Sequence, residues 1–195
     1  MLYATRPWLL CLLVTVAIEL PQALAESPED AISIVNAANL KGGVVVHVGA
    51  ENGGFTAALR QSESTVVHGL VDASAALAEA REYVSAQGLS GPVSFSLLTD
   101  RTLPYVDNSV NLLVATRPLP VDAKEVMRVL CPNGAAVVLE GENRRWLSNV
   151  DRPKLPGPRG YVMLRKPAQP GIDSWTHFLH GPDGHAVSYT HLRAH

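Results

Sequence analysis

The feature that most constrains the fold of this chain is an apolar, β-branched run that stops at a glycine-bearing loop. Residues 44–48 read VVVHV, the loop opens at Gly49 and contains Gly53, and an apolar helical segment over residues 55–61 follows. A strand, a tight turn and a helix in this order predict a turn whose backbone approaches a nucleotide-like ligand at the carboxyl edge of a sheet.

The alternation of strand and helix continues along the chain. Apolar runs predict strands over residues 44–48, 66–70, 93–97, 110–115 and 135–140, with helices over residues 55–61, 74–87 and 121–130. Near-continuous valine and leucine strands are typical of a parallel sheet that is covered on both faces. The pattern therefore predicts an α/β fold built on a Rossmann-like, doubly wound, mostly parallel sheet.

Segments on either side of this alternation complete the expected domain. The apolar spacing predicts a lead-in helix over residues 26–39. Residues 141–160 are basic and punctuated by proline, so we expect a loop there, and a short strand over residues 161–165 follows it. We therefore expect one α/β domain over residues 40–166.

Three further segments carry recognisable motifs. Residues 66–74 read VVHGLVDAS and lead into a helix that ends AEAR, residues 103–114 read LPYVDNSVNLLV, and residues 125–134 read EVMRVLCPNG. Together with the glycine loop, and in this order, they resemble the motifs of class I S-adenosylmethionine-dependent methyltransferases of the type 11 kind. The resemblance covers residues 44–139 and implies the same Rossmann-like fold.

The resemblance also implies S-adenosylmethionine as the cofactor, bound at the carboxyl ends of the first three strands. Gly49, Glu51 and Gly53 stand at the positions of the family's glycine loop. Asp72 lies next to the position of the ribose-binding acid, and Asp100 follows the third strand, where the family's adenine-contacting acid falls. These five residues are the predicted cofactor-binding set.

Several positions depart from the family's pattern on the cofactor side. His47 stands where the family has an acid, Glu51 replaces the central glycine of the loop, and Val71 holds the ribose-binding position, with Asp72 one place later. Asn111 replaces the aspartate of the fourth strand. A carboxylate at position 51 would either repel the carboxylate of the ligand or bind its amino group.

Most of these residues also have a structural interpretation. Asp72 would serve the ribose hydroxyls or cap the helix that follows it, a role for which Ser74 competes. His47 would be a hydrogen-bonded histidine at a strand edge or a base. Asn111 would hold a substrate or start the fourth strand. Methyl transfer depends on alignment and needs no nucleophile, so the catalytic residues are unknown from sequence.

Charge and metal-ligand patterns narrow the range of partners. The 16 lysines and arginines are balanced by 18 acidic residues and form no basic stripe, which excludes nucleic acid as the expected partner. His177 and His180 have no third ligand in register, so no metal site is predicted.

The two ends of the chain read differently from the middle. Residues 1–25 combine Arg6, an apolar core and a small-x-small site at Ala23 and Ala25, which predicts a signal peptide and an exported protein. An uncleaved anchor is the alternative, and beyond this signal no membrane contact is expected. After cleavage Cys131 is the single remaining cysteine, so no internal disulfide is expected.

At the other end, we interpret residues 167–186 as a linker and the start of a further domain, which would contact the α/β domain. Residues 173–184 resemble the entry segment of secreted pyrroloquinoline-quinone-type β-propeller proteins. Residues 187–195 resemble a translated sequencing adapter and are predicted not to belong to the natural chain. Two functions therefore compete: a methyltransferase, or a non-catalytic binding or docking module of an exported propeller protein.

Overall fold

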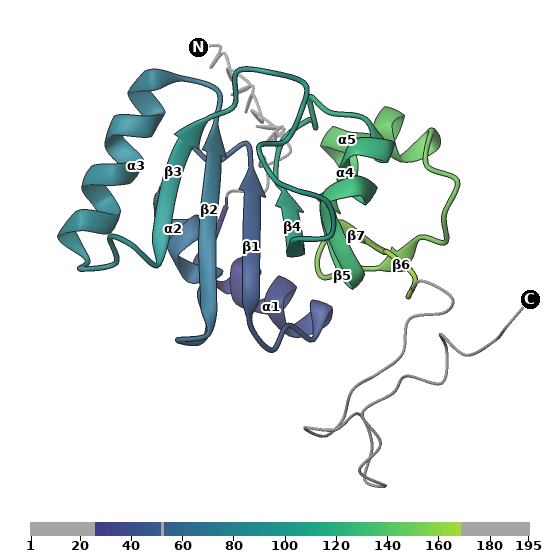
Figure 1. The fold of residues 1–195 in the computed structure, drawn as a ribbon, viewed down its shortest axis with the longest axis horizontal. Coiled ribbons are helices and arrows are strands. Elements are labelled where there is room, and N and C mark those ends of the chain that lie inside the picture. The colour runs from purple at the N-terminus through teal and green to yellow at the C-terminus, as the bar shows by residue number, and fades with distance from the viewer. Residues whose placement is uncertain (1–25, 52, 169–195) are drawn as a thin grey trace, which may run out of the picture.

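A seven-stranded sheet of order β3-β2-β1-β4-β5-β7-β6 organises the computed structural model, which describes residues 26–51 and 53–168 (Figure 1). The strands are β1 (Gly43–Val48), β2 (Thr65–Val71), β3 (Val93–Leu97), β4 (Val110–Ala115), β5 (Leu130–Leu139), β6 (Leu155–Pro156) and β7 (Tyr161–Arg165). Strands β1 to β5 run parallel, whereas β7 pairs antiparallel with β5 and β6. The predicted Rossmann-like α/β fold with a mostly parallel sheet is confirmed.

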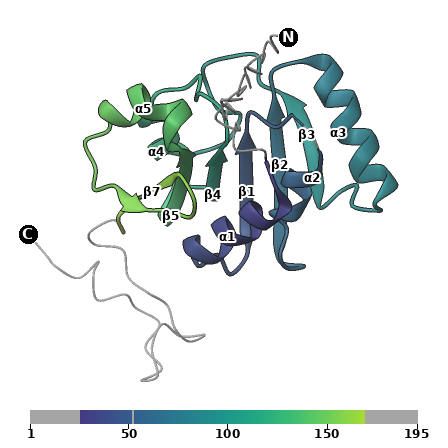
Figure 2. The ribbon, with the colours of Figure 1, turned by 180° about the vertical axis from the view of Figure 1, so that it is seen from behind.

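Helices cover both faces of the sheet (Figures 1 and 2). They are α1 (Pro28–Ala38), α2 (Gly53–Ala58), α3 (Ser74–Ala86), α4 (Ala123–Val129) and α5 (Glu140–Ser148). Ile34, Phe55 and Val84 of the first three helices lie in one hydrophobic cluster. Val126 and Leu147 of the last two lie in another, on the opposite face of the sheet. The sheet is therefore doubly wound.

Capping residues explain where two of the helices begin. Ser27 precedes α1, and its side chain accepts a hydrogen bond of 3.1 Å from the backbone N–H of Asp30. Asp122 precedes α4, and its carboxylate accepts one of 2.8 Å from the N–H of Glu125. Each bond satisfies a helix N–H that has no intrahelical partner.

The prediction of a loop from residue 141 onward is wrong at its start, because α5 occupies Glu140–Ser148. Its arginines suggested a solvated loop, but Leu147 is buried and Trp146 packs against the same cluster. The Trp146 indole also donates a hydrogen bond of 2.8 Å to the carbonyl of Val121. The segment is therefore amphipathic: its charged residues dominate the composition, but its apolar side packs on the core, which favours a helix.

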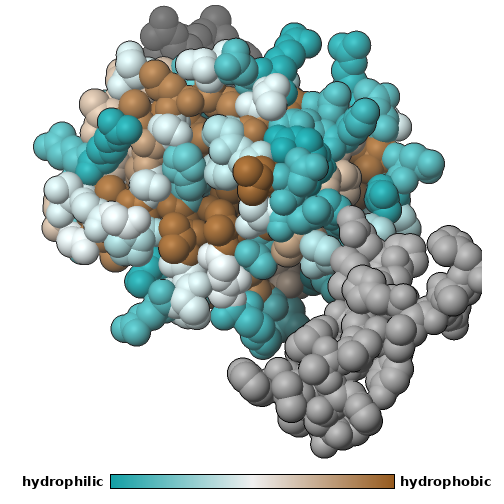
Figure 3. Space-filling view, viewed as in Figure 1, coloured by the Kyte–Doolittle hydropathy of each residue, from teal (hydrophilic) through white to brown (hydrophobic). Residues whose placement is uncertain are grey.

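The sheet is not covered on both faces along its whole width. Residues 98–109, between β3 and β4, are fully described and contain no helix. On β3, Val93 and Phe95 are buried while Ser94 is exposed, as expected for a strand with one open face. This side of the sheet is the one in view in Figure 3, where hydrophobic patches lie among polar side chains. Val66 of β2 and Val106 of the loop are exposed large hydrophobic residues.

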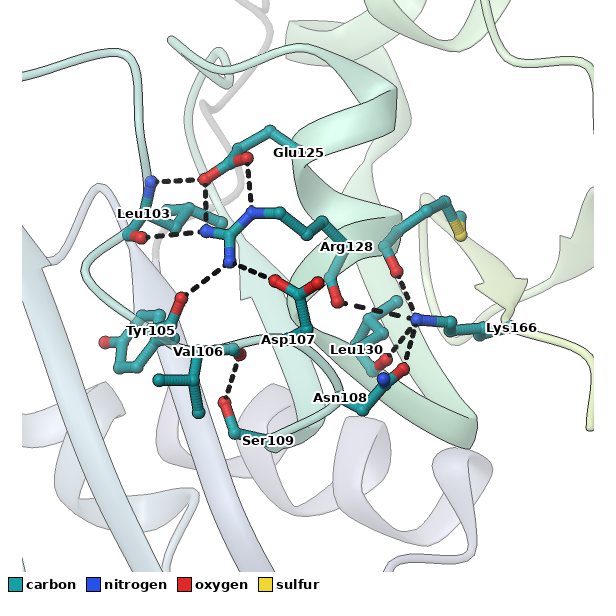
Figure 4. Close-up of polar contacts among 11 residues, drawn as sticks. Leu103, Tyr105, Val106, Asp107, Asn108, Ser109, Glu125, Arg128, Leu130 and Lys166 are labelled. Carbon is teal, nitrogen blue, oxygen red and sulfur yellow. Dashed lines mark hydrogen bonds and ion pairs between the residues drawn. The ribbon is translucent and has the colours of Figure 1, made fainter. Parts of the chain in front are cut away.

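The loop over residues 98–109 is held by Arg128 of α4 (Figure 4). The guanidinium donates hydrogen bonds to the carbonyls of Leu103 and Tyr105, at 3.2 and 2.8 Å. It also binds the carboxylates of Asp107, at 2.8 Å, and Glu125, at 2.7 and 2.8 Å. The motif over residues 103–114 and the motif over residues 125–134 are thus bonded to each other.

Several sequence predictions lie outside the described residues. These are the signal peptide, the propeller-like segment, the adapter-like tail, and the histidine pair at positions 177 and 180. Within residues 26–51 and 53–168, no helix is both long enough and apolar enough to span a bilayer. The same residues contain no group of three or more His, Cys, Asp or Glu side chains that could hold a metal ion.

Candidate functional site

A cavity of about 400 Å³ opens at the carboxyl ends of β1, β2, β3 and β4. β1 lies between β2 and β4 in the sheet, so the strand order reverses beside it. Ligands of open α/β sheets bind in the crevice at such a reversal. A cavity of this size, lined by apolar side chains and a few polar groups, is typical of small-molecule sites.

Three of the five predicted cofactor-binding residues line this cavity. Gly49 follows β1, Asp72 follows β2, and Asp100 lies in the segment after β3. The structure therefore brings together residues that are far apart in the sequence. Glu51 and Gly53 do not line it in the part of the chain that the structure describes.

Gly49 is required by its backbone and by its neighbour. Its φ of +83° lies in the left-handed region that favours glycine. A Cβ at this position would also lie 2.8 Å from the Cβ of Arg117, a residue that follows β4 and lines the same cavity. Any side chain at position 49 would therefore displace Arg117.

Glu51 forms an ion pair with Arg117. Their side chains are 55% and 45% exposed, so both charges are solvated as well as paired. The charge of Glu51 is therefore compensated by Arg117. Pairs this exposed contribute little to stability, about 0–1 kcal/mol, so Arg117 can exchange Glu51 for another anion at small cost.

Gly53 has a packing role. A Cβ on this residue would lie 2.6 Å from Cδ1 of Tyr83, which belongs to α3. The missing side chain therefore lets the start of α2 approach α3 closely.

Asp72 does not cap α3. The N-cap residue is Ala73, and no side-chain hydrogen bond caps this helix, so the capping interpretation is wrong for both Asp72 and Ser74. The carboxylate of Asp72 is exposed at the cavity wall. Asp100 is likewise exposed there, with a long hydrogen bond of 3.4 Å from the hydroxyl of Thr99.

His47 is fully buried on β1 and has a partner at each ring nitrogen. Nδ1 lies 2.8 Å from the hydroxyl of Thr56, and Nε2 lies 2.9 Å from the hydroxyl of Thr116. Burial lowers the pKa of His47 to about 3, so the ring is neutral at pH 7 and is too weakly basic to act as a general base. The prediction of a hydrogen-bonded histidine is confirmed, although β1 is a central strand and not an edge.

Asn111 lies at the start of β4, as its structural interpretation predicts. Its side-chain oxygen accepts a hydrogen bond of 2.9 Å from the N–H of Val44, and its amide donates one of 3.4 Å to the sulfur of Cys131. An aspartate could make the first contact but could not donate in the second. The asparagine that replaces the family's aspartate thus uses its amide group to bond Cys131.

Two arginines were missed by reasoning from the sequence. Arg117 follows β4 and Arg101 follows Asp100, and both line the cavity. Asp72 and Asp100 were predicted from the resemblance to the methyltransferase family; the two arginines could have been found because each lies a few residues after a strand. A second cavity of about 640 Å³ shares Arg101 with the first and extends to Trp146 of α5.

No protein-family model and no curated protein sequence matches this chain. Solved structures do match it. A candidate S-adenosyl-L-methionine-dependent methyltransferase from Methanococcus maripaludis is 16% identical, with a TM-score of 0.62, over 75% of this chain and 88% of that one.

Two enzymes match over a smaller share. The [4+2]-cyclase SpnF is 24% identical, with a TM-score of 0.51, over 57% of this chain and 43% of its own. The geranyl diphosphate C-methyltransferase of Streptomyces coelicolor A3(2), solved with Mg²⁺, geranyl diphosphate and S-adenosyl-L-homocysteine, is 16% identical, with a TM-score of 0.51. That match covers 56% of this chain and 44% of the enzyme, so this chain spans less than half the length of either. The described residues are therefore structurally similar to class I S-adenosylmethionine-dependent methyltransferases.

Proposed function

We propose that this chain binds S-adenosylmethionine in the cavity at the carboxyl edge of the sheet and acts as a methyltransferase. The observation that carries the proposal is the meeting of Gly49, Asp72 and Asp100 around one cavity. The match to an enzyme solved with S-adenosyl-L-homocysteine supports a ligand of this type.

The residues at the cavity fit the chemical groups of this cofactor. Asp72 would accept hydrogen bonds from the ribose hydroxyls and Asp100 from the adenine amino group. Gly49, which has no Cβ, would let the backbone approach the methionine portion. Arg117 would pair with the cofactor's carboxylate in place of Glu51, since a guanidinium and a carboxylate form a strong, charge-assisted contact.

The protein's part in the reaction is alignment. When bound, the cofactor supplies an activated methyl group on a sulfonium. The second cavity, which adjoins the first at Arg101, would hold the acceptor. Holding two reactants in line can account for a large part of a rate enhancement, so the site needs no nucleophilic side chain.

Isothermal titration calorimetry of the purified chain with S-adenosylmethionine and S-adenosyl-L-homocysteine tests the proposal. Asp72→Asn and Asp100→Asn should each weaken binding by about 1–3 kcal/mol, the cost of removing a hydrogen-bond partner. Asp151→Asn, at an exposed position away from the cavity lining, is the matched control and should bind like the wild type. A folded wild-type chain that binds neither compound would refute the proposal.

The second candidate is a non-catalytic binding or docking module of an exported protein. The departures at positions 47, 51 and 71 and the apolar leader over residues 1–25 favour it. In that case the chain would keep its fold and would neither bind the cofactor nor transfer methyl groups. Recovery of the chain from the exported fraction of its native cells, with Glu26 as its first residue, would support the export that this function requires.

A further inference from the structure

A directed chain of hydrogen bonds links the carboxyl ends of β1 and β4 to Glu26. The hydroxyl of Thr116 donates to Oε1 of Glu26 at 2.6 Å. Because that proton is committed, Thr116 accepts from Nε2–H of His47 at 2.9 Å, and Nδ1 of His47 accepts from the hydroxyl of Thr56 at 2.8 Å. In neutral His47 one ring nitrogen donates and the other accepts, so the donation from Thr116 to Glu26 assigns the proton to Nε2.

The chain of bonds ends in a carboxyl group with one free oxygen. The side chain of Glu26 is 11% exposed, and its buried Oε2 has no hydrogen-bond partner among the described residues. Burial raises the pKa of Glu26, opposed by the hydrogen bond from Thr116 and the positive charge of Arg117. A buried carboxylate that keeps an unused acceptor destabilises the fold, which suggests a function at that oxygen.

Glu26 is not among the residues that line the candidate ligand cavity, but its hydrogen-bond chain reaches the neighbours of two residues that do. Its partner Thr116 directly precedes Arg117, and His47 lies two residues before Gly49. Arg117 and Gly49 both line the cavity. His47 stands where the family that this sequence resembles has an acid. The fold brings a carboxylate to this histidine from the amino-terminal segment, with Oε1 of Glu26 3.8 Å from Nε2.

We propose that Oε2 of Glu26 accepts a hydrogen bond from the primary ammonium group of the ligand in this cavity. The inference rests on the proposed function, because S-adenosylmethionine carries such a group on its methionine portion. Arg117 and Glu26 would then together recognise the amino-acid end of the ligand. The guanidinium of Arg117 would bind the ligand's carboxylate, and the carboxylate of Glu26 would bind the ligand's ammonium group.

Calorimetry with a pair of probes tests this assignment. S-adenosyl-L-homocysteine carries the ammonium group, whereas 5′-methylthioadenosine has the same nucleoside and thioether without the amino-acid portion. Glu26→Gln should weaken binding of S-adenosyl-L-homocysteine at least tenfold and change binding of 5′-methylthioadenosine by less than twofold. Glu29→Gln, at an exposed position on α1, is the matched control and should leave both affinities unchanged.

Thermal unfolding separates a binding role from a structural one. Because glutamine removes a buried charge, Glu26→Gln should keep or raise the melting temperature at pH 7 while it loses affinity. Equal weakening of both probes together with a lower melting temperature would overturn the inference, as would unchanged affinity for S-adenosyl-L-homocysteine. A wild-type chain that binds neither probe would refute the proposed function and this inference with it, whereas binding by the wild type with no effect of Glu26→Gln refutes the inference alone.

Discussion

Replacing Arg128 with methionine should destabilise the protein by removing the side chain that joins α4 to the loop before β4. Arg128 donates five hydrogen bonds, two of them to backbone carbonyls of the loop and three to carboxylates (Figure 4). Methionine keeps much of the apolar stem of the side chain, so the change isolates the guanidinium. The carbonyls of Leu103 and Tyr105 would lose this partner.

The expected loss is about 2–3 kcal/mol in the free energy of unfolding. Hydrogen bonds to charged groups contribute about 1.5–3 kcal/mol each, but bonds from one side chain are not additive. The side chain is also 30% exposed, so water partly replaces the lost partners. The loss should depend on pH, because the hydrogen bonds from Arg128 hold the pKa of Glu125 below its ordinary value of 4.5. The contribution of this pair is present above pH 4.5 and disappears as the pH falls through the lowered pKa.

Urea unfolding followed by circular dichroism at pH 7 and at low pH measures this effect. Arg128→Lys should recover only part of the loss, since an ammonium cannot reproduce the fork of the guanidinium. Arg144→Met, at an exposed position on α5, is the control and should change stability by less than about 0.5 kcal/mol. A loss below about 0.5 kcal/mol in Arg128→Met, or full recovery by lysine, would show that the network does not hold the loop.

Three further predictions concern residues near the carboxyl ends of the strands, Glu51 and Glu26, and Asn111 at the start of β4. Glu51→Gly should strengthen binding of S-adenosylmethionine in calorimetry, because it frees Arg117 for the ligand; weaker binding would instead identify Glu51 as a ligand contact. Asn111→Asp should lower the free energy of unfolding at pH 7 by about 1 kcal/mol, because a carboxylate cannot donate to Cys131 and only the weak S–H donor of Cys131 could then make this contact; an unchanged value in urea unfolding would contradict this. Because the pKa of Glu26 is raised in the folded state, its charge destabilises the fold as the pH rises above 4.5. The stability of Glu26→Gln relative to the wild type should therefore increase as the pH rises from 4.5 through the raised pKa in urea unfolding, and a difference that is the same below pH 4.5 and at pH 7 would refute the shift.

Hydrophobic runs were enough to predict most of the sheet. β3, β4 and β7 have the bounds that their apolar residues predict, because side chains that must leave water mark a strand locally. The same local pattern predicts the turn at Gly49, whereas Asp72 and Asp100 were predicted from the resemblance to the methyltransferase family. The order of strands thus predicts the edge of the sheet at which the cavity lies, and the resemblance predicts its two acids.

Tertiary structure decided what those residues touch. The pairing of Glu51 with Arg117 and the chain from His47 to Glu26 join segments that are distant in the sequence, and no local pattern encodes such contacts. The apolar pattern of β3 likewise could not predict that one face of this strand is open. That face is open because the connection from β3 to β4 contains no helix. The sequence by itself determined the layers and the edge at which a ligand would bind, through local burial and periodicity. Only the fold decided which partners the two carboxylates near this edge have. Glu51 pairs with Arg117 and Glu26 with Thr116, and both partners follow β4, which is distant from them in the sequence.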